Sequence, residues 1–178
     1  MRSRDVLYSP GRNDECYTPA YAVRALVPHL PRGLTYWCPF DREDSRFVVE
    51  LDRAGLDVVY SHLDYGHDYF EYEPPEWDVM VSNPPYTNKA GVFRRALSLG
   101  KPFALLMTLT WLNDRAPKTL FRERQLQLLM FEERVLYAGQ EAKITFSSAY
   151  FCCDLLSRQI VMDSLVPYGY PNKKNFLP

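Results

Sequence analysis

The stretch Asp78-Val79-Met80-Val81-Ser82-Asn83-Pro84-Pro85-Tyr86 joins a short apolar run to a turn that contains an amide, two prolines and an aromatic ring. A short apolar run that ends at prolines is typical of a buried strand. Asn83 offers a side-chain carbonyl, and Pro84 offers a backbone carbonyl beside a ring that fixes φ. An exocyclic amino group of a nucleobase could donate both its protons to these two acceptors, which makes its nitrogen more nucleophilic, while Tyr86 supplies a flat face for the base. We call residues 83–86 the clamp.

Apolar runs alternate with helix-like segments along the rest of the chain, a pattern that predicts an α/β fold with a mainly parallel sheet. Helices are expected at residues 21–29, 45–54, 91–99 and 118–130, and further strands at 34–40, 57–63, 102–110, 133–137 and 148–156. The last two strands are expected to form an antiparallel pair at the sheet edge. Ligands bind beyond the carboxyl ends of the strands in such sheets, so the clamp lies where a ligand site is expected.

Composition indicates one globular domain over residues 1–178. The chain has 178 residues, of which 47% are hydrophobic and 24% charged, enough for one sizeable core. With 21 Lys and Arg against 22 Asp and Glu, the net charge is −1, so any nucleic-acid contact must come from a local basic patch. Aromatic residues reach 15%, and several lie in polar segments where they could line a site.

Cysteine and histidine usage predicts a reduced cytoplasm and no metal. Cys16, Cys38, Cys152 and Cys153 show no C-x-x-C spacing, and no secretory leader is recognised. The three histidines are not spaced with other ligands as in a zinc or di-metal centre. The longest apolar stretch, around residues 102–109, is too short to cross a bilayer, so a soluble protein without membrane contact is expected.

The Asn-Pro-Pro-Tyr motif of the clamp resembles the catalytic motif of S-adenosylmethionine-dependent amino-methyltransferases, chiefly those that act on adenine N6. Residues 39–47, in which Pro39, Phe40 and Asp41 lead to Ser45 and Phe47, look like the variant found in EcoRI-type enzymes and their small phage relatives. The resemblance runs, with gaps, over about residues 16–107. It implies a Rossmann-like class I methyltransferase fold with a mainly parallel seven-stranded sheet and helices on both faces. It also implies a bacterial or phage-infected cytoplasm.

The resemblance implies a cofactor, S-adenosylmethionine, and residues that bind it. Tyr17 and Thr18 look like the segment that holds the methionine carboxylate at the start of a helix. Asp41 would face the ammonium group of the cofactor. The glycine-rich turn that usually follows the first strand is missing here, which leaves a non-binding relative as an alternative. Acidic residues at a helix start can also serve only as caps.

Two further carboxylates are expected at the cofactor by the same resemblance. Asp64, after the second strand, is a candidate for the ribose hydroxyls, with His62 as the rival for that place. Asp68 would accept from the amino group of the cofactor's adenine while a ring, that of Tyr69 or Phe70, covers its face. For both carboxylates the alternative is an ordinary exposed side chain in a polar loop.

The clamp predicts a mechanism without a general base. The amino nitrogen attacks the methyl group in line, and the two carbonyl acceptors stabilise the positive charge that forms on nitrogen. An adenine in a duplex must be flipped out to reach such a site, where Tyr86 would stack on it and Phe146 or Tyr150 could add a second face. The residues expected to take part in catalysis are Asn83, Pro84, Pro85 and Tyr86.

The expected partner is nucleic acid, with DNA as the first choice, and no separate target-recognition domain is expected. The candidate contacts are basic residues that follow the clamp or lie beyond the fifth strand, namely Lys89, Arg94, Arg95, Arg115, Lys118, Arg122 and Arg124, with the tail at 172–175 as a further one. Their alternative is a solvated helix face, favoured for Arg122 and Arg124. Three functions remain open: an N6-adenine methyltransferase acting on DNA, the same chemistry on RNA or a protein glutamine, and a non-catalytic binding relative. The sequence does not indicate the oligomeric state.

Overall fold

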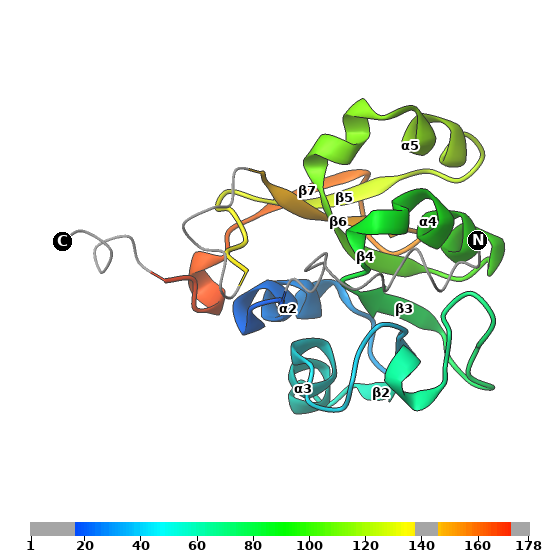
Figure 1. The fold of residues 1–178 in the computed structure, drawn as a ribbon. Helices are drawn as coiled ribbons and strands as arrows, with labels where there is room; N and C mark the ends of the chain where they lie inside the picture. Colours follow the sequence, from blue (N-terminus) through cyan, green and yellow to red (C-terminus); the bar gives the residue numbers. More distant parts are fainter. Residues whose placement is uncertain (1–16, 138–145, 172–178) are drawn as a thin grey trace.

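The computed structural model describes residues 17–137 and 146–171 of the chain (Figure 1), so Cys16 and the tail at 172–175 lie outside the described part. Within that part, seven strands form one sheet in the order β2-β1-β3-β4-β6-β5-β7. The strands are β1 Thr35–Cys38, β2 Asp57–Tyr60, β3 Val79–Ser82, β4 Phe103–Thr108, β5 Gln127–Phe131, β6 Ser148–Cys153 and β7 Ile160–Asp163. Strand β6 runs antiparallel to both its neighbours, and all the other pairs are parallel. The expected mainly parallel, seven-stranded sheet is confirmed.

Short helices connect these strands. The α-helices of the described residues are α2 Ala20–Leu26, α3 Arg46–Arg53, α4 Lys89–Ser98 and α5 Arg115–Leu120. The 3₁₀ turns are η1 Val27–His29, η2 Leu63–Tyr65, η3 Tyr86–Asn88, η4 Leu109–Asn113 and η5 Val166–Tyr168. The first three predicted helices correspond to α2 with η1, α3 and α4, because apolar spacing and capping residues are local signals.

Both faces of the sheet are covered, as Figure 1 shows for α2 and α3 on one side and α4 and α5 on the other. Side chains along a strand alternate between the two faces. Tyr36 and Cys38 of β1 therefore pack with α2 and α3, whereas Trp37 packs with α4. Met80 of β3 lies on the α4 side, between Val79 and Val81, which face the other way. Two apolar layers thus enclose the centre of the sheet, where every side chain of β3 and β4 is buried, and this fixes where those strands end.

Strand order reverses at β1. The chain passes from β1 to β2 on one side and then crosses to place β3 on the other side of β1. In open α/β sheets, such a switch point leaves a crevice beyond the carboxyl ends of the two strands. The segment that follows β1 contains Asp41, and the one that follows β3 contains the clamp. The topology therefore brings both candidate segments to this switch point.

The predicted helix at residues 118–130 is wrong. Helix α5 ends at Leu120, and residues 127–131 form β5, which pairs with β6 and β7. The run Gln127-Leu128-Leu129-Met130-Phe131 suits either a helix or a strand, so pairing with β6 decides its structure. Gln127 supports this outcome, because its buried amide oxygen accepts from the backbone N–H of Leu155 and Leu156 at 2.9 Å each.

The predicted arrangement at the sheet edge is also wrong. Residues 133–137 form no strand; instead the Glu133 carboxylate accepts from the backbone N–H of Leu165 at 2.7 Å. Strand β6 ends at Cys153, three residues before the predicted end, because Asp154 takes a left-handed φ of 52°. The edge is formed by β7, which the sequence did not predict because its apolar run, residues 160–162, is too short to indicate a strand.

Candidate active site

The clamp begins where β3 ends. Ser82 is the last residue of the strand and is buried, and the two prolines that follow Asn83 cannot continue a ladder because they lack an N–H. Pro85 has extended backbone with φ −61° and ψ 139°, and turn η3 starts directly after it. Asn88 then caps helix α4 by accepting from the N–H of Gly91 at 3.2 Å. Strand end, clamp and helix start therefore follow one another within eight residues.

Thr18 holds the side chain of Asn83. The Asn83 amide nitrogen donates to the Thr18 hydroxyl at 3.0 Å, although 65 residues separate the two in sequence. Thr18 is only 8% exposed and precedes α2, whose N-cap position is taken by Pro19 without a side-chain cap bond. The threonine hydroxyl thus serves the clamp and does not cap the helix. Because the nitrogen end of the amide faces Thr18, its carbonyl end points away from Thr18. Tyr17, beside it, is exposed.

Asp41 is a buried carboxylate three residues after β1. It is 8% exposed, and its Oδ2 accepts from the Ser82 hydroxyl at 2.5 Å. Burial raises the pKa of Asp41 to about 6, while hydrogen bonds from Ser82 and Ser45 oppose that rise. Serine hydroxyls are neutral and do not balance the negative charge of the Asp41 carboxylate. A cation bound beside Asp41 would therefore stabilise its ionised form. The Ser82 bond also joins the segment after β1 to the residue that precedes Asn83.

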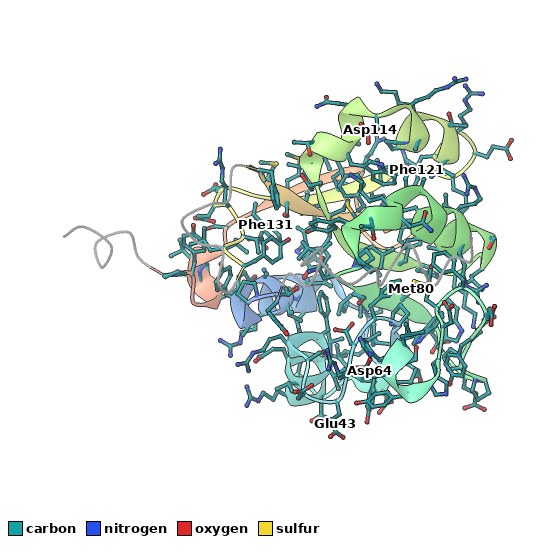
Figure 2. All side chains as sticks on the ribbon, viewed as in Figure 1. Glu43, Asp64, Met80, Asp114, Phe121 and Phe131 are labelled. Carbon is teal, nitrogen blue, oxygen red and sulfur yellow. The ribbon has the colours of Figure 1, made fainter. Side chains whose placement is uncertain are left out.

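Asp64 has a different environment, because it lies in η2 and is 57% exposed. Its carboxylate is 3.1 Å from Nη1 of Arg42 and 3.4 Å from Nδ1 of His62. Figure 2 shows Asp64 in the lower part of the molecule, which also contains Glu43. The Asp64 N–H donates to His62 Nδ1 at 3.1 Å, so that nitrogen acts as an acceptor. The structure thus brings together the two residues predicted as rivals.

Asp68 and Tyr69 are neighbours in sequence but have different environments. Asp68 is half-buried, and its Oδ1 accepts from the N–H of Phe70 at 2.9 Å in a local turn. Tyr69 is 3% exposed, and its hydroxyl donates to the Val92 carbonyl at 3.0 Å. Its ring is therefore part of the core under α4. The centroid of the half-buried Phe40 ring lies 4.6 Å from that of Tyr69. Phe40 belongs to the Pro39-Phe40-Asp41 segment, and the sequence suggested no role for its ring.

Tyr86 is half-buried and contacts two residues from the far half of the chain. Its hydroxyl lies 3.0 Å from the Tyr137 hydroxyl, and its ring meets that of Phe146 edge-on at 6.4 Å between centroids. Phe146 is thus beside Tyr86, as one predicted alternative requires. The other alternative, Tyr150, is fully buried and donates to the Ala22 carbonyl at 3.0 Å. It cannot present a face to a base.

The basic residues divide into exposed and structural ones. Arg94, Arg115, Lys118 and Arg122 are exposed, and Lys89, the first residue of α4, is half-buried three residues after Tyr86. By contrast, Arg95 donates to the Tyr72 carbonyl, and Arg124 donates to the Leu97 carbonyl and Asp154. Arg115 and Lys118 come after the carboxyl end of β4. Because β4 is parallel to β3, they follow the same end of the sheet as the clamp.

The described residues contain no group of three or more His, Cys, Asp and Glu side chains that could hold a metal ion. In the same part of the chain, the helices are too short and too polar to cross a membrane.

No family model matches the chain, and no curated protein matches it. Among solved structures, one similar fold is that of a Vibrio vulnificus protein described as the modification subunit of a type I restriction enzyme. The TM-score is 0.53 at 15% identity, over 90% of this chain and 48% of that one, so the chain spans about half the length of that protein. An Agrobacterium tumefaciens protein described as an O-methyltransferase has a TM-score of 0.43 at 10% identity, over 79% of this chain and 83% of the other. The first comparison shows a shared Rossmann-like fold.

Proposed function

We propose that the chain transfers a methyl group from S-adenosylmethionine to the N6 amino group of adenine in DNA. The observation that carries this proposal is the meeting of two segments at the switch point: the Ser82–Asp41 hydrogen bond of 2.5 Å places a buried carboxylate directly beside the clamp. A methyl donor with a cationic ammonium group suits the first segment, and an amino acceptor suits the second. The shared fold with a protein described as a restriction-enzyme modification subunit supports DNA as the substrate class.

The residues at the crevice fit the proposed cofactor. Asp41, surrounded by hydroxyl partners, would accept from the ammonium group, and the backbone around Tyr17 and Thr18 would meet the carboxylate. Asp64 is exposed enough to accept from ribose hydroxyls beside Arg42. S-adenosylmethionine, when bound, supplies an electrophilic methyl group.

Asp68 and an aromatic ring complete the proposed cofactor site. Asp68 would accept from the adenine amino group of the cofactor, at the turn where its Oδ1 already accepts from Phe70. Since Tyr69 is buried, the half-buried rings of Phe40 or Phe70 would cover the adenine, and Tyr69 would support Phe40 from below. This changes the role of Tyr69 from a direct contact to a supporting one.

The clamp would then raise the reactivity of the target amino group. Thr18 holds the nitrogen end of the Asn83 amide, so the carbonyl end is the one presented to the target. That oxygen and the Pro84 carbonyl would accept the two amino protons and stabilise the positive charge that develops on nitrogen. Pro85 fixes the turn, and Tyr86 would stack on the extruded base. The proton of the methylated amino group would leave afterwards to solvent.

Basic residues around the crevice would bind the phosphate backbone. Lys89, Arg94, Arg115 and Lys118 are the proposed contacts, because they lie beyond β3 and β4 or on the helices that follow them. With a net charge of −1, the chain offers no general attraction to DNA. We therefore expect modest affinity that depends on these few side chains.

A transfer assay with labelled S-adenosylmethionine tests the proposal. The full chain is incubated in parallel with duplex DNA, single-stranded DNA, RNA and protein, and the products are digested and separated by chromatography. N6-methyladenine from DNA is the expected product, and Asn83→Ala is the matched negative control. Label in RNA or in glutamine would overturn the DNA substrate, and cofactor binding without transfer to any of the four would identify a non-catalytic relative.

A further inference from the structure

A hydrogen-bonded chain of three hydroxyl groups leads from the clamp into the core. The Tyr86 hydroxyl is 3.0 Å from that of Tyr137, and the Tyr137 hydroxyl donates to the Ser148 hydroxyl at 2.9 Å. Tyr137 is fully buried and Ser148 is 3% exposed, so the chain runs from a half-buried ring to fully enclosed groups. These residues come from three separate segments of the chain.

The hydrogen bonds between these three hydroxyl groups have a defined donor order. A tyrosine hydroxyl has one proton, and Tyr137 uses its proton toward Ser148. In the bond between the two tyrosines, the donor is therefore Tyr86. Removal of the Tyr137 hydroxyl would leave the Tyr86 hydroxyl without that acceptor.

Rigid segments hold the inner end of this chain. Ser148 is the first residue of β6 and lies opposite Thr108 in the β4–β6 register. The backbone before Tyr137 is held by helix α2, since the Leu136 N–H donates to the Tyr21 hydroxyl at 2.9 Å. The edge of the Phe146 ring also contacts Tyr86. The Tyr86 ring is thus held at its hydroxyl end and on one side.

We propose that Tyr137 and Ser148 are positioning residues for the target base: they hold the ring of Tyr86 in the plane in which it stacks on an adenine. This inference rests on the proposed function. A ring free to rotate would lose contact area with the base, whereas a ring held at its hydroxyl end and on one side is ready before the base arrives. The clamp is then shaped by the antiparallel part of the sheet as well as by β3, which it follows.

A double-mutant cycle separates this role from simple core packing. Tyr137→Phe, Tyr86→Phe and the double variant are compared for kcat and KM toward the DNA substrate and KM toward S-adenosylmethionine. Each single variant should lower kcat/KM for DNA by about 3- to 30-fold, the effect of one hydrogen bond that supports stacking. The cofactor KM should not change. The double variant should be no worse than Tyr137→Phe alone, because the bond that Tyr86→Phe breaks is already absent in that variant.

Tyr150→Phe is the matched control. Tyr150 is also fully buried, also donates one hydrogen bond and lies two residues from Ser148, but its partner is the Ala22 carbonyl. It should lower thermal stability as much as Tyr137→Phe and leave kcat/KM for DNA unchanged. Ser148→Ala provides a second break in the chain should Tyr137→Phe fail to fold, and it should lower kcat/KM for DNA in the same direction.

Several outcomes would overturn the positioning role. Additive losses in the double variant, an equal loss in Tyr150→Phe, or a wild-type rate in both Tyr137→Phe and Ser148→Ala would each show that the hydroxyl chain is only core structure. A wild-type chain that transfers no methyl group would contradict the proposed function itself, and the positioning role with it. The two failures are therefore distinguishable.

Discussion

The segments that follow β1 and β3 meet at the switch point of the sheet but differ in how they are built. The segment after β1 depends on charge, since Asp41 is a buried carboxylate whose partners are serine hydroxyls. The segment after β3 depends on neutral dipoles and shape, and its Asn83 and Tyr86 side chains are held by residues 65 and 51 positions away in sequence. A charged group responds to pH and to a cationic ligand, whereas a held amide acts on the transition state. We therefore expect the first segment to govern cofactor affinity and the second to govern turnover.

The largest expected effect is on turnover. Asn83→Ala removes an acceptor whose interaction strengthens as the amino nitrogen gains charge, so kcat should fall by about 10²–10³-fold. Cofactor affinity, measured by calorimetry, should stay within about twofold of wild type, because Asn83 belongs to the other segment. Asn83→Asp keeps an acceptor and should retain part of the activity. If Asn83→Ala methylates as fast as wild type with its fold intact, the clamp is only a turn.

Next in size is a loss of cofactor affinity. Asp41→Ala should weaken S-adenosylmethionine binding by about 1–3 kcal/mol, the effect of leaving a charged group without its hydrogen-bonding partner. Asp64→Ala is the matched control, since that carboxylate is exposed and already paired with Arg42. Its loss should be smaller, within about 1 kcal/mol. Calorimetric titration of both variants checks this order, and an Asp64 effect larger than that of Asp41 would reverse the assignment.

The pH dependence of cofactor binding should be about tenfold. With a pKa of about 6, Asp41 is ionised at pH 7.5 and mostly protonated at pH 5, so affinity should fall about tenfold between these values. The free energy of unfolding of the cofactor-free chain should show the opposite trend and be higher at pH 5 than at pH 7.5. Because burial raises the pKa of Asp41 above its ordinary value of 3.8, its contribution to stability is fully present below about pH 4 and is lost as pH rises through about 6.

Asp41→Asn is the control for both trends. The amide cannot titrate, so both trends should flatten in this variant. Calorimetry at several pH values and urea unfolding of the cofactor-free chain provide the two measurements. A wild-type affinity that is constant from pH 5 to 7.5 would exclude Asp41 as the ammonium partner.

The smallest expected effect concerns phosphate contacts. The slope of log affinity for DNA against log salt should correspond to about 2–5 contacts. Arg115→Ala should reduce that slope by roughly one contact. Arg124→Ala removes the same charge from a residue that bonds to Leu97 and Asp154, so it should lower stability and leave the slope unchanged. Tight binding that ignores salt would contradict the proposed basic contacts.

The order of strands and helices up to β4 could be predicted from the sequence because its signals are local. Alternation of apolar residues, the prolines after Asn83 and the cap at Ser45 each act within a few residues. From α5 onward this failed. The apolar run at 127–131 has no local feature that excludes a helix, and only its pairing with β6 makes it a strand.

Local sequence also determined that Asp41 and the clamp each follow the carboxyl end of a strand, whereas the strand order brought the two segments together. Only the tertiary structure decided their partners and their burial. Thr18 and Tyr137 contact the clamp across long sequence separations, and Tyr69 is enclosed under α4 although it lies in a polar segment. Burial and hydrogen bonding between distant segments depend on how helices pack on the sheet, which no short stretch of sequence contains.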